Sequence, residues 1–253
     1  MSNSGSSVPG RPQLSVVIPA CNEEMRLPGT LEDVLRYLTR QSFRSEIIVV
    51  DDGSSDGTVK AARSFCGGTV PVRICAHPDS ANHGKGASVR MGMLQSRGEF
   101  CLFMDADNST TVDQIADFWP AFDRGFDVIV GSRKAPGAHV LVHQRWYKEV
   151  AGRFGNLVIR SLAVPGVSDT QAGFKMFTRE CVETVFPQLT IDRWGMDIEI
   201  LAVARFLNFR ICEMPITWIN SPSSKVGVLS YFQVLSDVWR VHRNLRSGVY
   251  RRG

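Results

Sequence analysis

Two aspartates, Asp105 and Asp107, end a short apolar run at residues 100–104 and are the residues whose spacing most suggests chemistry. In an extended strand, residues two apart project to the same side, so both carboxylates can face one point. Oxygen ligands at this spacing suit a divalent cation that bridges to a diphosphate, a common use of Mg²⁺ or Mn²⁺. The alternative is a solvated turn, because aspartate is common in turns.

Short β-branched runs alternate with amphipathic stretches along the first half of the chain. The pattern predicts strands over residues 14–19, 46–50, 70–76, 100–104 and 126–130, and helices over residues 27–40, 58–65, 87–96 and 112–124. Such alternation indicates an α/β fold with a mostly parallel sheet and right-handed crossovers. In sheets of this kind, ligands bind beyond the carboxyl ends of the strands.

Polar loops follow four of these strands, at residues 22–23, 51–52, 105–107 and 132–133. The carboxyl ends of parallel strands meet at one edge, so these loops are expected to converge, which favours the metal site over the turn. Asp51 or Asp52 could accept a hydrogen bond from a base or a ribose hydroxyl, or could cap a helix.

Three basic residues lie close to this expected edge. Lys85 lies between two glycines at a helix start, where it offers an ammonium group and backbone N–H groups to an anion. Arg133 and Arg145 could balance a diphosphate or form surface salt bridges. The chain has no Walker lysine motif and no GxGxxG after its first strand, which argues against a P-loop or a dinucleotide site.

Composition indicates an ordinary globular protein. The 253 residues are 43% hydrophobic and 21% charged, with a net charge of +4, and the basic residues form no recognised nucleic-acid-binding motif. We expect a disordered leader over residues 1–12 and a single domain over residues 13–253. The six cysteines show no metal-ligand spacing, and most lie in apolar runs, where a reduced cysteine behaves as a small hydrophobic residue. This pattern favours a reducing, cytosolic compartment. No stretch reaches the roughly 18 apolar residues that a membrane span needs.

Seven motifs together resemble those of the family-2 inverting glycosyltransferases, which have a Rossmann-like GT-A fold. They occupy residues 17–23, 49–58, 82–86, 104–107, 131–133, 169–175 and 193–199. The combination looks like the branch of the dolichyl-phosphate glucosyltransferases, which neighbours the dolichyl-phosphate mannose synthases. The similarity covers roughly residues 14–246. It implies a nucleotide-sugar half over residues 13–133 and an acceptor half over residues 134–253.

The resemblance implies a donor site. The residues that match positions lining the nucleotide base and ribose are Pro19, Cys21, Glu23, Asp51, Asp52 and the backbone of Ala106. Asp105 and Asp107 match the pair that holds Mg²⁺ or Mn²⁺ and the diphosphate, and Arg133 and Arg145 match basic residues near the phosphates. Cys21 departs from the family's usual Tyr. Ser109 replaces a Gln that serves some relatives as a third metal ligand.

The resemblance also implies a mechanism. The metal, Lys85 and Arg133 would stabilise the negative charge that grows on the leaving nucleoside diphosphate. A polyprenyl phosphate acceptor needs no strong base, because its second pKa of about 6 leaves it largely ionised at neutral pH. Asp169, Asp197 and Glu199 are candidates for orienting the acceptor or binding sugar hydroxyls. If the acceptor were a sugar hydroxyl, one of them would have to act as base. We expect catalysis to involve Asp105, Asp107, Arg133, Asp169 and Asp197.

Two expected helices, over residues 141–164 and 228–246, carry aromatic and basic residues. Such amphipathic helices can lie in the headgroup plane of a membrane, or can cover the sheet or pack a homodimer. The resemblance implies transfer of a hexose onto a polyprenyl phosphate at the cytosolic membrane face. Its motifs over residues 169–199 favour glucose from UDP-glucose over mannose from GDP-mannose. The alternatives are transfer to a soluble or polysaccharide acceptor, and a non-catalytic module that binds nucleotide sugar.

Overall fold

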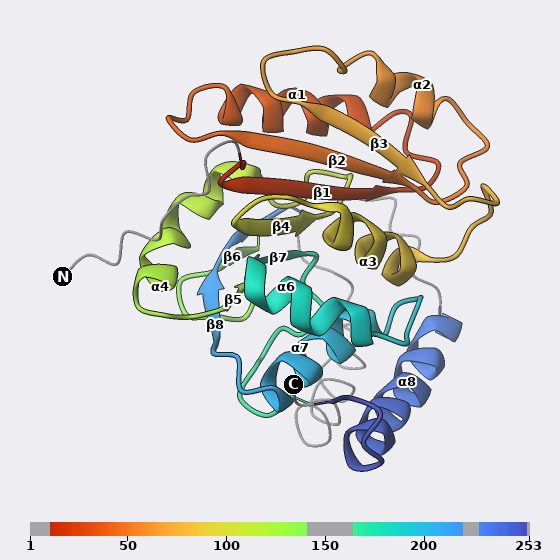
Figure 1. Cartoon of the computed structure of the whole chain (residues 1–253), viewed down its shortest axis with the longest axis vertical. Helices are drawn as coiled ribbons and strands as arrows, with labels where there is room; N and C mark the ends of the chain where they lie inside the picture. The colour runs from red at the N-terminus through yellow and green to blue at the C-terminus, as the bar shows by residue number, and fades with distance from the viewer. Residues whose placement is uncertain (1–10, 141–163, 220–227, 252–253) are drawn as a thin grey trace.

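The computed structural model describes residues 11–140, 164–219 and 228–251 (Figure 1). Most of the expected leader, nearly all of the expected helix over residues 141–164, and Arg145 lie outside these ranges.

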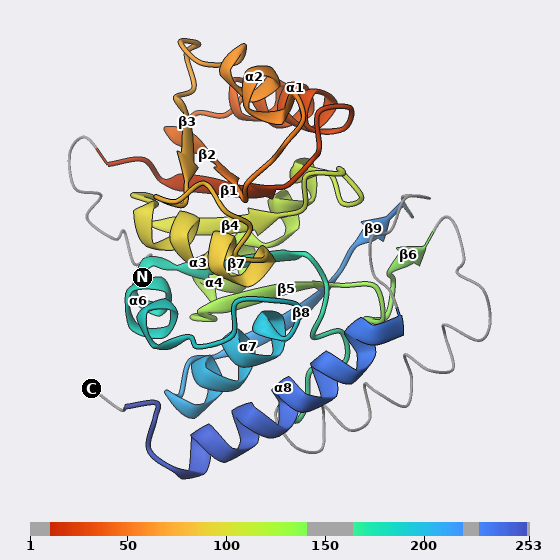
Figure 2. The ribbon, with the colours of Figure 1, turned by 90° about the vertical axis from the view of Figure 1, so that its right-hand side faces the viewer.

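A twisted sheet runs through the described part of the chain, with the strand order β3-β2-β1-β4-β7-β5-β8. All of its neighbouring strands pair parallel except β7, which runs antiparallel to both β4 and β5. Two short strands, β6 and β9, pair with each other beside it (Figure 2). The strands are β1 Leu14–Ala20, β2 Ser45–Asp51, β3 Val72–Ala76, β4 Phe100–Met104, β5 Val128–Ser132, β6 His139–Val140, β7 Phe174–Thr178, β8 Ile211–Pro215 and β9 Thr217–Trp218.

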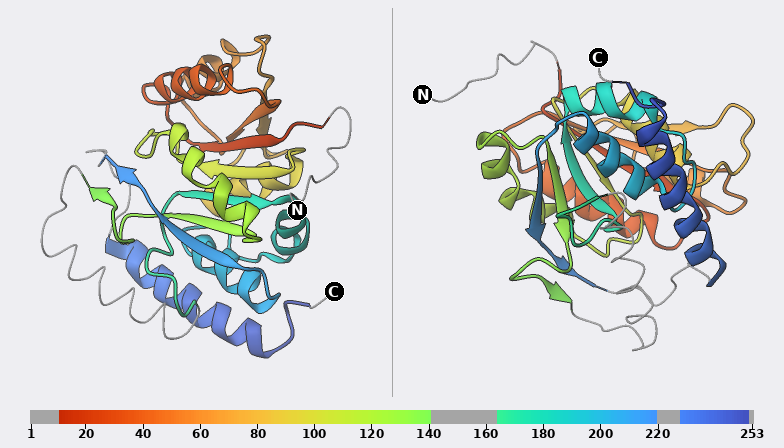
Figure 3. Two further views of the ribbon diagram at one scale, coloured as in Figure 1. Left: turned by 90° about the vertical axis from the view of Figure 1, so that its left-hand side faces the viewer. Right: turned by 90° about the horizontal axis from the view of Figure 1, so that it is seen from below.

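Helices cover both faces of the sheet, and α7 and α8 run side by side on one of them (Figure 3). The helices are α1 Leu27–Leu38, α2 Thr58–Arg63, α3 Lys85–Gln95, α4 Trp119–Asp123, α6 Arg179–Val185, α7 Met196–Phe206 and α8 Val228–Arg246. Two 3₁₀ helices, η1 Val112–Asp117 and η2 Phe186–Gln188, complete the described elements.

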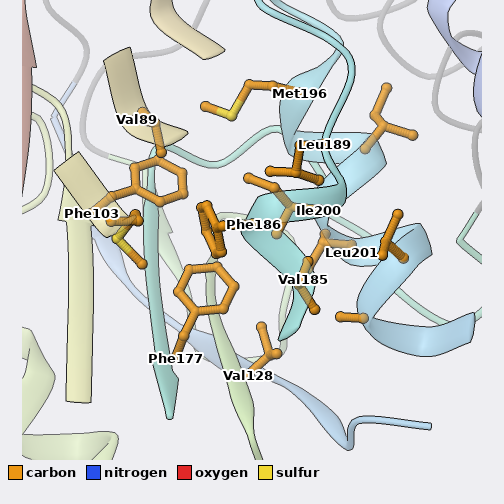
Figure 4. Packing of buried hydrophobic residues seen from close by; sticks show 14 of the residues in the cluster. Val89, Phe103, Val128, Phe177, Val185, Phe186, Leu189, Met196, Ile200 and Leu201 are labelled. Atoms are coloured by element: carbon orange, nitrogen blue, oxygen red, sulfur yellow. The ribbon is translucent and has the colours of Figure 1, made fainter. Parts of the chain in front are cut away.

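The alternation of side chains along the strands builds a hydrophobic cluster on each face of the sheet. In β4, Leu102 and Met104 pack into the cluster under α1 and η1, whereas Cys101 and Phe103 pack into the cluster under α3, α6 and α7. Figure 4 shows this second cluster, in which the ring of Phe177 lies against that of Phe186. The buried strands thus hold their carboxyl-end loops on a rigid base.

The five predicted strands and the mostly parallel α/β sheet are confirmed, with ends that shift by up to two residues. The single helix predicted over residues 112–124 is wrong: the chain forms η1 and then the separate short helix α4, which has Pro120 in its first turn. A proline within a helix removes a hydrogen bond and clashes with the preceding turn, so one continuous helix is disfavoured there. The predicted helix over residues 228–246 is confirmed as α8.

Candidate active site

The site forms where β1, β2, β4 and β5 end, because these strands all point in the same direction. Asp105 and Asp107 follow β4 directly. The Nζ atom of Lys85 lies 2.7 Å from Oδ1 of Asp105, and Nη1 of Arg26 lies 4.0 Å from Oδ2 of Asp107. The two carboxylates of the loop after β4 therefore meet two cations at this edge, Lys85 from the start of α3 and Arg26 from the loop before α1.

The lack of a side chain at Gly173 leaves room for the Asp105 carboxylate. A Cβ atom added to Gly173 would overlap all three atoms of that carboxyl group. Burial opposes the charged ammonium group of Lys85, but the neighbouring Asp105 and Asp197 outweigh this effect and raise the pKa of Lys85. Lys85 is therefore a permanent cation at neutral pH, in contact with one of the two predicted metal ligands.

The donor set fits a hard divalent cation. Within the described residues no group of three or more His, Cys, Asp or Glu side chains is gathered for a metal. Mg²⁺ commonly binds through one or two carboxylates and completes its coordination with substrate phosphates and water. Asp105 and Asp107 would supply those two carboxylates. Ser109, buried behind them, donates its backbone N–H to Oδ1 of Asp107 at 3.1 Å.

Asp52 fixes the loop that leads into α3. Its buried carboxylate accepts hydrogen bonds from the backbone N–H groups of His83 and Gly84, at 2.8 Å and 3.0 Å, and from the side-chain amide of Asn82 at 3.0 Å. Gly84 has a φ of +100°, which favours glycine. Lys85 follows at the start of α3, so Asp52 sets the position of this lysine.

The other residues expected around the base and ribose also lie at this edge. Asp51 ends β2, and its carboxylate accepts the backbone N–H of Ser54 at 3.3 Å. Cys21 follows β1, and its Sγ atom accepts a hydrogen bond from Asn82 at 3.3 Å. Pro19 pairs with Val50 inside the sheet.

Arg26 organises the loop after β1. It donates two hydrogen bonds of 2.6 Å to the Glu23 carboxylate, one to each oxygen. The backbone carbonyl of Ala106 accepts a 2.8 Å hydrogen bond from Thr30 on α1, which ties the loop after β4 to the same region.

Arg133, after β5, is held by Asp169. Oδ2 of Asp169 accepts Nε and the backbone N–H of Arg133 at 2.8 Å and 2.9 Å, and Oδ1 accepts Nη2 at 2.7 Å. Burial favours the neutral form of Asp169, but Arg133 outweighs it and lowers the pKa of this carboxyl group. The Arg133 guanidinium also lies 5.3 Å from the centre of the Trp218 ring, within range of a cation–π interaction.

A small pocket opens between the loops that carry these groups. It is lined by Asp105, Ser109, Thr110, Arg133, Ala172, Gly173, Ile216 and Trp218. The positively charged Arg133 and the negatively charged Asp105 thus face a common space.

Lys175 lies beneath this site, on the antiparallel strand β7. Its side chain is fully buried, its Nζ atom lies 2.5 Å from Oδ1 of Asp197, and it also donates to the carbonyl of Ala172. Burial, which Asp197 only partly offsets, lowers the pKa of Lys175. Its Nζ atom lies 5.2 Å from the centre of the Phe103 ring, and Nζ of Lys85 lies 5.9 Å from the same centre.

Glu199, the remaining carboxylate proposed to orient the acceptor, is buried on α7. Its oxygens accept hydrogen bonds from the backbone of Thr190 and Ile191 and from the hydroxyl of Tyr250. Glu199 therefore fixes the loop at residues 190–191 and the segment after α8 that carries Tyr250.

The structure brings most of the predicted residues together, whereas Arg145 falls outside the described ranges. Sequence reasoning missed four residues that act on the site: Arg26, Gly173, Lys175 and Trp218. A lysine in the middle of an apolar run, as in residues 174–177, signals a buried charge that needs a carboxylate partner. That signal could have identified Lys175, and the motif at residues 169–175 contains both Lys175 and Gly173. Nothing in the sequence shows where Arg26 and Trp218 lie.

Comparisons with known proteins agree with this geometry. The model of the family described as "Glycosyl transferase family 2" matches residues 15–188. A dolichyl-phosphate beta-glucosyltransferase of Dictyostelium discoideum is 35% identical over 249 residues, which cover 94% of this chain and 76% of that protein. A human protein of the same name is 34% identical over 256 residues, covering 94% of this chain and 78% of the relative.

Solved structures share the fold. Mannosyl-3-phosphoglycerate synthase of Rubrobacter xylanophilus matches with a TM-score of 0.69 at 17% identity, covering 96% of this chain and 76% of that one. Glucosyl-3-phosphoglycerate synthase of Mycobacterium tuberculosis was solved with Mn²⁺, UDP and glucosyl-3-phosphoglycerate. It matches with a TM-score of 0.64 at 18% identity, covering 92% of this chain and 81% of that one. The resemblance found in the sequence is thereby confirmed, and the chain belongs to glycosyl transferase family 2 as a glycosyltransferase with a GT-A fold.

Proposed function

We propose that this chain transfers glucose from UDP-glucose to dolichyl phosphate, or a related polyprenyl phosphate, with inversion at the anomeric carbon. The two relatives described above, each about a third identical over 94% of the chain, are named for glucosyl transfer to dolichyl phosphate. The cluster of Asp105, Asp107, Lys85 and Arg133 at the sheet edge supports a donor that carries a diphosphate.

Within one domain, residues 13–133 bind the donor and residues 134–253 receive the acceptor. Pro19, Cys21, Glu23, Asp51, Asp52 and Ala106 border the base and ribose. Asp105 and Asp107 would hold Mg²⁺ or Mn²⁺, which supplies charge stabilisation for the leaving diphosphate. Lys85 contacts Asp105, and from this position its ammonium group would also meet the donor diphosphate.

The state of the candidate bases is the observation that most favours a phosphate acceptor. Asp169 is bound to Arg133 through both oxygens and has a lowered pKa, so it is a poor proton acceptor. Asp197 is paired with the buried Lys175. An acceptor phosphate that is already ionised requires neither of them as a base. Asp169 and Asp197 then contribute by holding Arg133 and Lys175 in place.

Helix α8 supports an encounter with a membrane surface. Val234, Val238 and Val241 pack into the core, whereas Leu235 and Trp239, the latter 61% exposed, face outward. Three arginines on this helix, Arg240, Arg243 and Arg246, provide charges for anionic headgroups. No helix among the described residues is long and apolar enough to span a bilayer. The outward face of α8 supports our proposal that the protein binds peripherally at the cytosolic membrane face.

A panel of labelled nucleotide sugars tests the donor and the acceptor together. Purified protein is incubated with Mn²⁺ or Mg²⁺ and each donor, with and without dolichyl phosphate, and label is measured in the organic phase. Label from UDP-glucose that appears only with the lipid is the expected result. Label from GDP-mannose instead would overturn the choice of donor, and transfer to soluble glycans alone would overturn the choice of acceptor.

A further inference from the structure

The buried carboxylate of Glu199 has a set of partners that the proposed reaction does not use. It accepts the backbone N–H of Thr190 at 3.0 Å, the Thr190 hydroxyl at 2.7 Å, the backbone N–H of Ile191 at 2.9 Å and the hydroxyl of Tyr250 at 2.7 Å. A buried charge is costly unless it is fully hydrogen-bonded, and these donors supply the bonds. Glu199 therefore locks residues 190–191 in one position.

Residues 191–192 press directly on the start of α3. The backbone N–H of Ala87 donates to the carbonyl of Asp192 at 3.0 Å. A Cβ atom on Gly84 would lie 2.6 Å from that same carbonyl oxygen, and one on Gly86 would lie 2.6 Å from the carbonyl oxygen of Ile191. The two glycines that flank Lys85 are thus in close contact with this segment.

Residues 250–251, which follow α8, contact both Glu199 and Gln188. Tyr250 is 2% exposed, and burial together with the Glu199 carboxylate raises its pKa, so its hydroxyl stays protonated and donates. Arg251 and Gln188 exchange two hydrogen bonds, of 2.7 Å and 3.3 Å. Helix α8 also packs against α7.

We propose that Tyr250 and Glu199 are positioning residues for the donor site: through residues 190–192 they hold the start of α3, and with it Lys85, against Asp105. We call Tyr250, Glu199 and residues 190–192 the C-terminal latch. The inference rests on the proposed role of Lys85 at the donor diphosphate. Removing the Tyr250 hydroxyl takes one buried hydrogen-bond donor away from Oε1 of Glu199. This oxygen then depends on Thr190 alone, so the position of residues 190–192, which contact α3, is expected to shift.

The test is a double-mutant cycle on nucleotide binding, which separates positioning from overall stability. Affinity for UDP with MnCl₂ is measured by calorimetry on the full chain for wild type, Y250F, K85A and the double variant, with melting temperatures in parallel. Y37F, on α1, is the matched control for loss of a tyrosine hydroxyl. Should Y250F fail to fold, Thr190→Val removes another donor to Glu199 and replaces it in the cycle.

The latch predicts that Y250F weakens UDP binding by about fivefold while Y37F leaves it unchanged. In the K85A background, Y250F is expected to cost no further affinity, although it lowers the melting temperature in both backgrounds. An unchanged UDP affinity in Y250F, or the same loss with and without Lys85, would overturn the latch. An unchanged affinity in K85A would instead remove Lys85 from the donor site, which is a failure of the proposed function.

Discussion

Asp169 holds Arg133 through both carboxylate oxygens, with side-chain hydrogen bonds of 2.7 Å and 2.8 Å. The two residues lie 36 positions apart in the sequence, one after β5 and the other before β7. A carboxylate bound in this way fixes the plane of the guanidinium group as well as its position. Arg133 therefore faces the site pocket in a defined orientation before any substrate arrives.

Loss of this arginine should be costly. We predict that Arg133→Ala lowers kcat/KM by about 30-fold, or about 2 kcal/mol, the range for a lost charged hydrogen bond. Asp169→Asn should give a smaller loss, because the arginine stays but loses its ionic partner. Steady-state transfer rates measure both. Equal rates in wild type and Arg133→Ala would reduce the arginine to a structural salt bridge.

The same pair predicts a pH dependence of stability. The folded-state pKa of Asp169 is lowered, so its contribution is fully present above the ordinary value of 3.8 and is lost as the pH falls through the lowered folded value. Wild type should therefore melt higher than Asp169→Asn at pH 7, by roughly 4–8 °C if the pair contributes about 2 kcal/mol. Thermal melts between pH 7 and pH 3 measure the gap. A gap that stays constant down to pH 3 would contradict the assignment.

Gly173 gives a prediction about geometry alone. Gly173→Ala places a methyl group on the Asp105 carboxylate, so we expect transfer activity to fall by at least about tenfold while the protein remains folded. Gly29→Ala on α1 is the matched control, because a Cβ atom at that position meets nothing within 4 Å and alanine favours a helix. Circular dichroism and rate measurements on both variants make the comparison. Full activity in Gly173→Ala would mean that Asp105 need not occupy its observed place.

Helix α8 gives a prediction about membranes. Trp239 is exposed and its ring lies 5.4 Å from the Arg243 guanidinium, so both could enter a headgroup layer together. We predict that wild type floats with anionic liposomes at low salt and is released at high salt, and that Trp239→Glu weakens this binding by about tenfold. Leu94→Glu, which changes an exposed apolar residue on α3, should leave it unchanged. No flotation of wild type at low salt would contradict an interfacial role.

The first half of the fold was predictable because each parallel strand is a local apolar run bounded by turns. Strand β4 was placed at residues 100–104, where it is observed. Strand β7 was missed, because its insertion between β4 and β5 depends on contacts between distant segments that no local pattern records. The break in the helix predicted over residues 112–124 was signalled by Pro120, which the amphipathic pattern around it outweighed.

The site followed the same division. Asp105 and Asp107 were predicted because the apolar run at residues 100–104 leads directly into the Asp-Ala-Asp sequence. The convergence of the loops followed from the parallel direction of the strands. The partner of each charge was not predictable. Lys175 pairs with Asp197, 22 residues away in the sequence, and Glu23 pairs with Arg26. Such pairings depend on rotamers and packing in three dimensions.

The most direct test of the account compares wild type with Asp107→Ala in the transfer of labelled glucose from UDP-glucose to dolichyl phosphate. The Asp107 side chain is partly exposed, so its loss should leave the fold intact. Asp117→Ala, which removes an exposed carboxylate from η1, is the control. We predict that Asp107→Ala loses metal-dependent UDP binding and glucose transfer, while Asp117→Ala keeps both. Near-normal transfer by a folded Asp107→Ala protein would contradict the central claim.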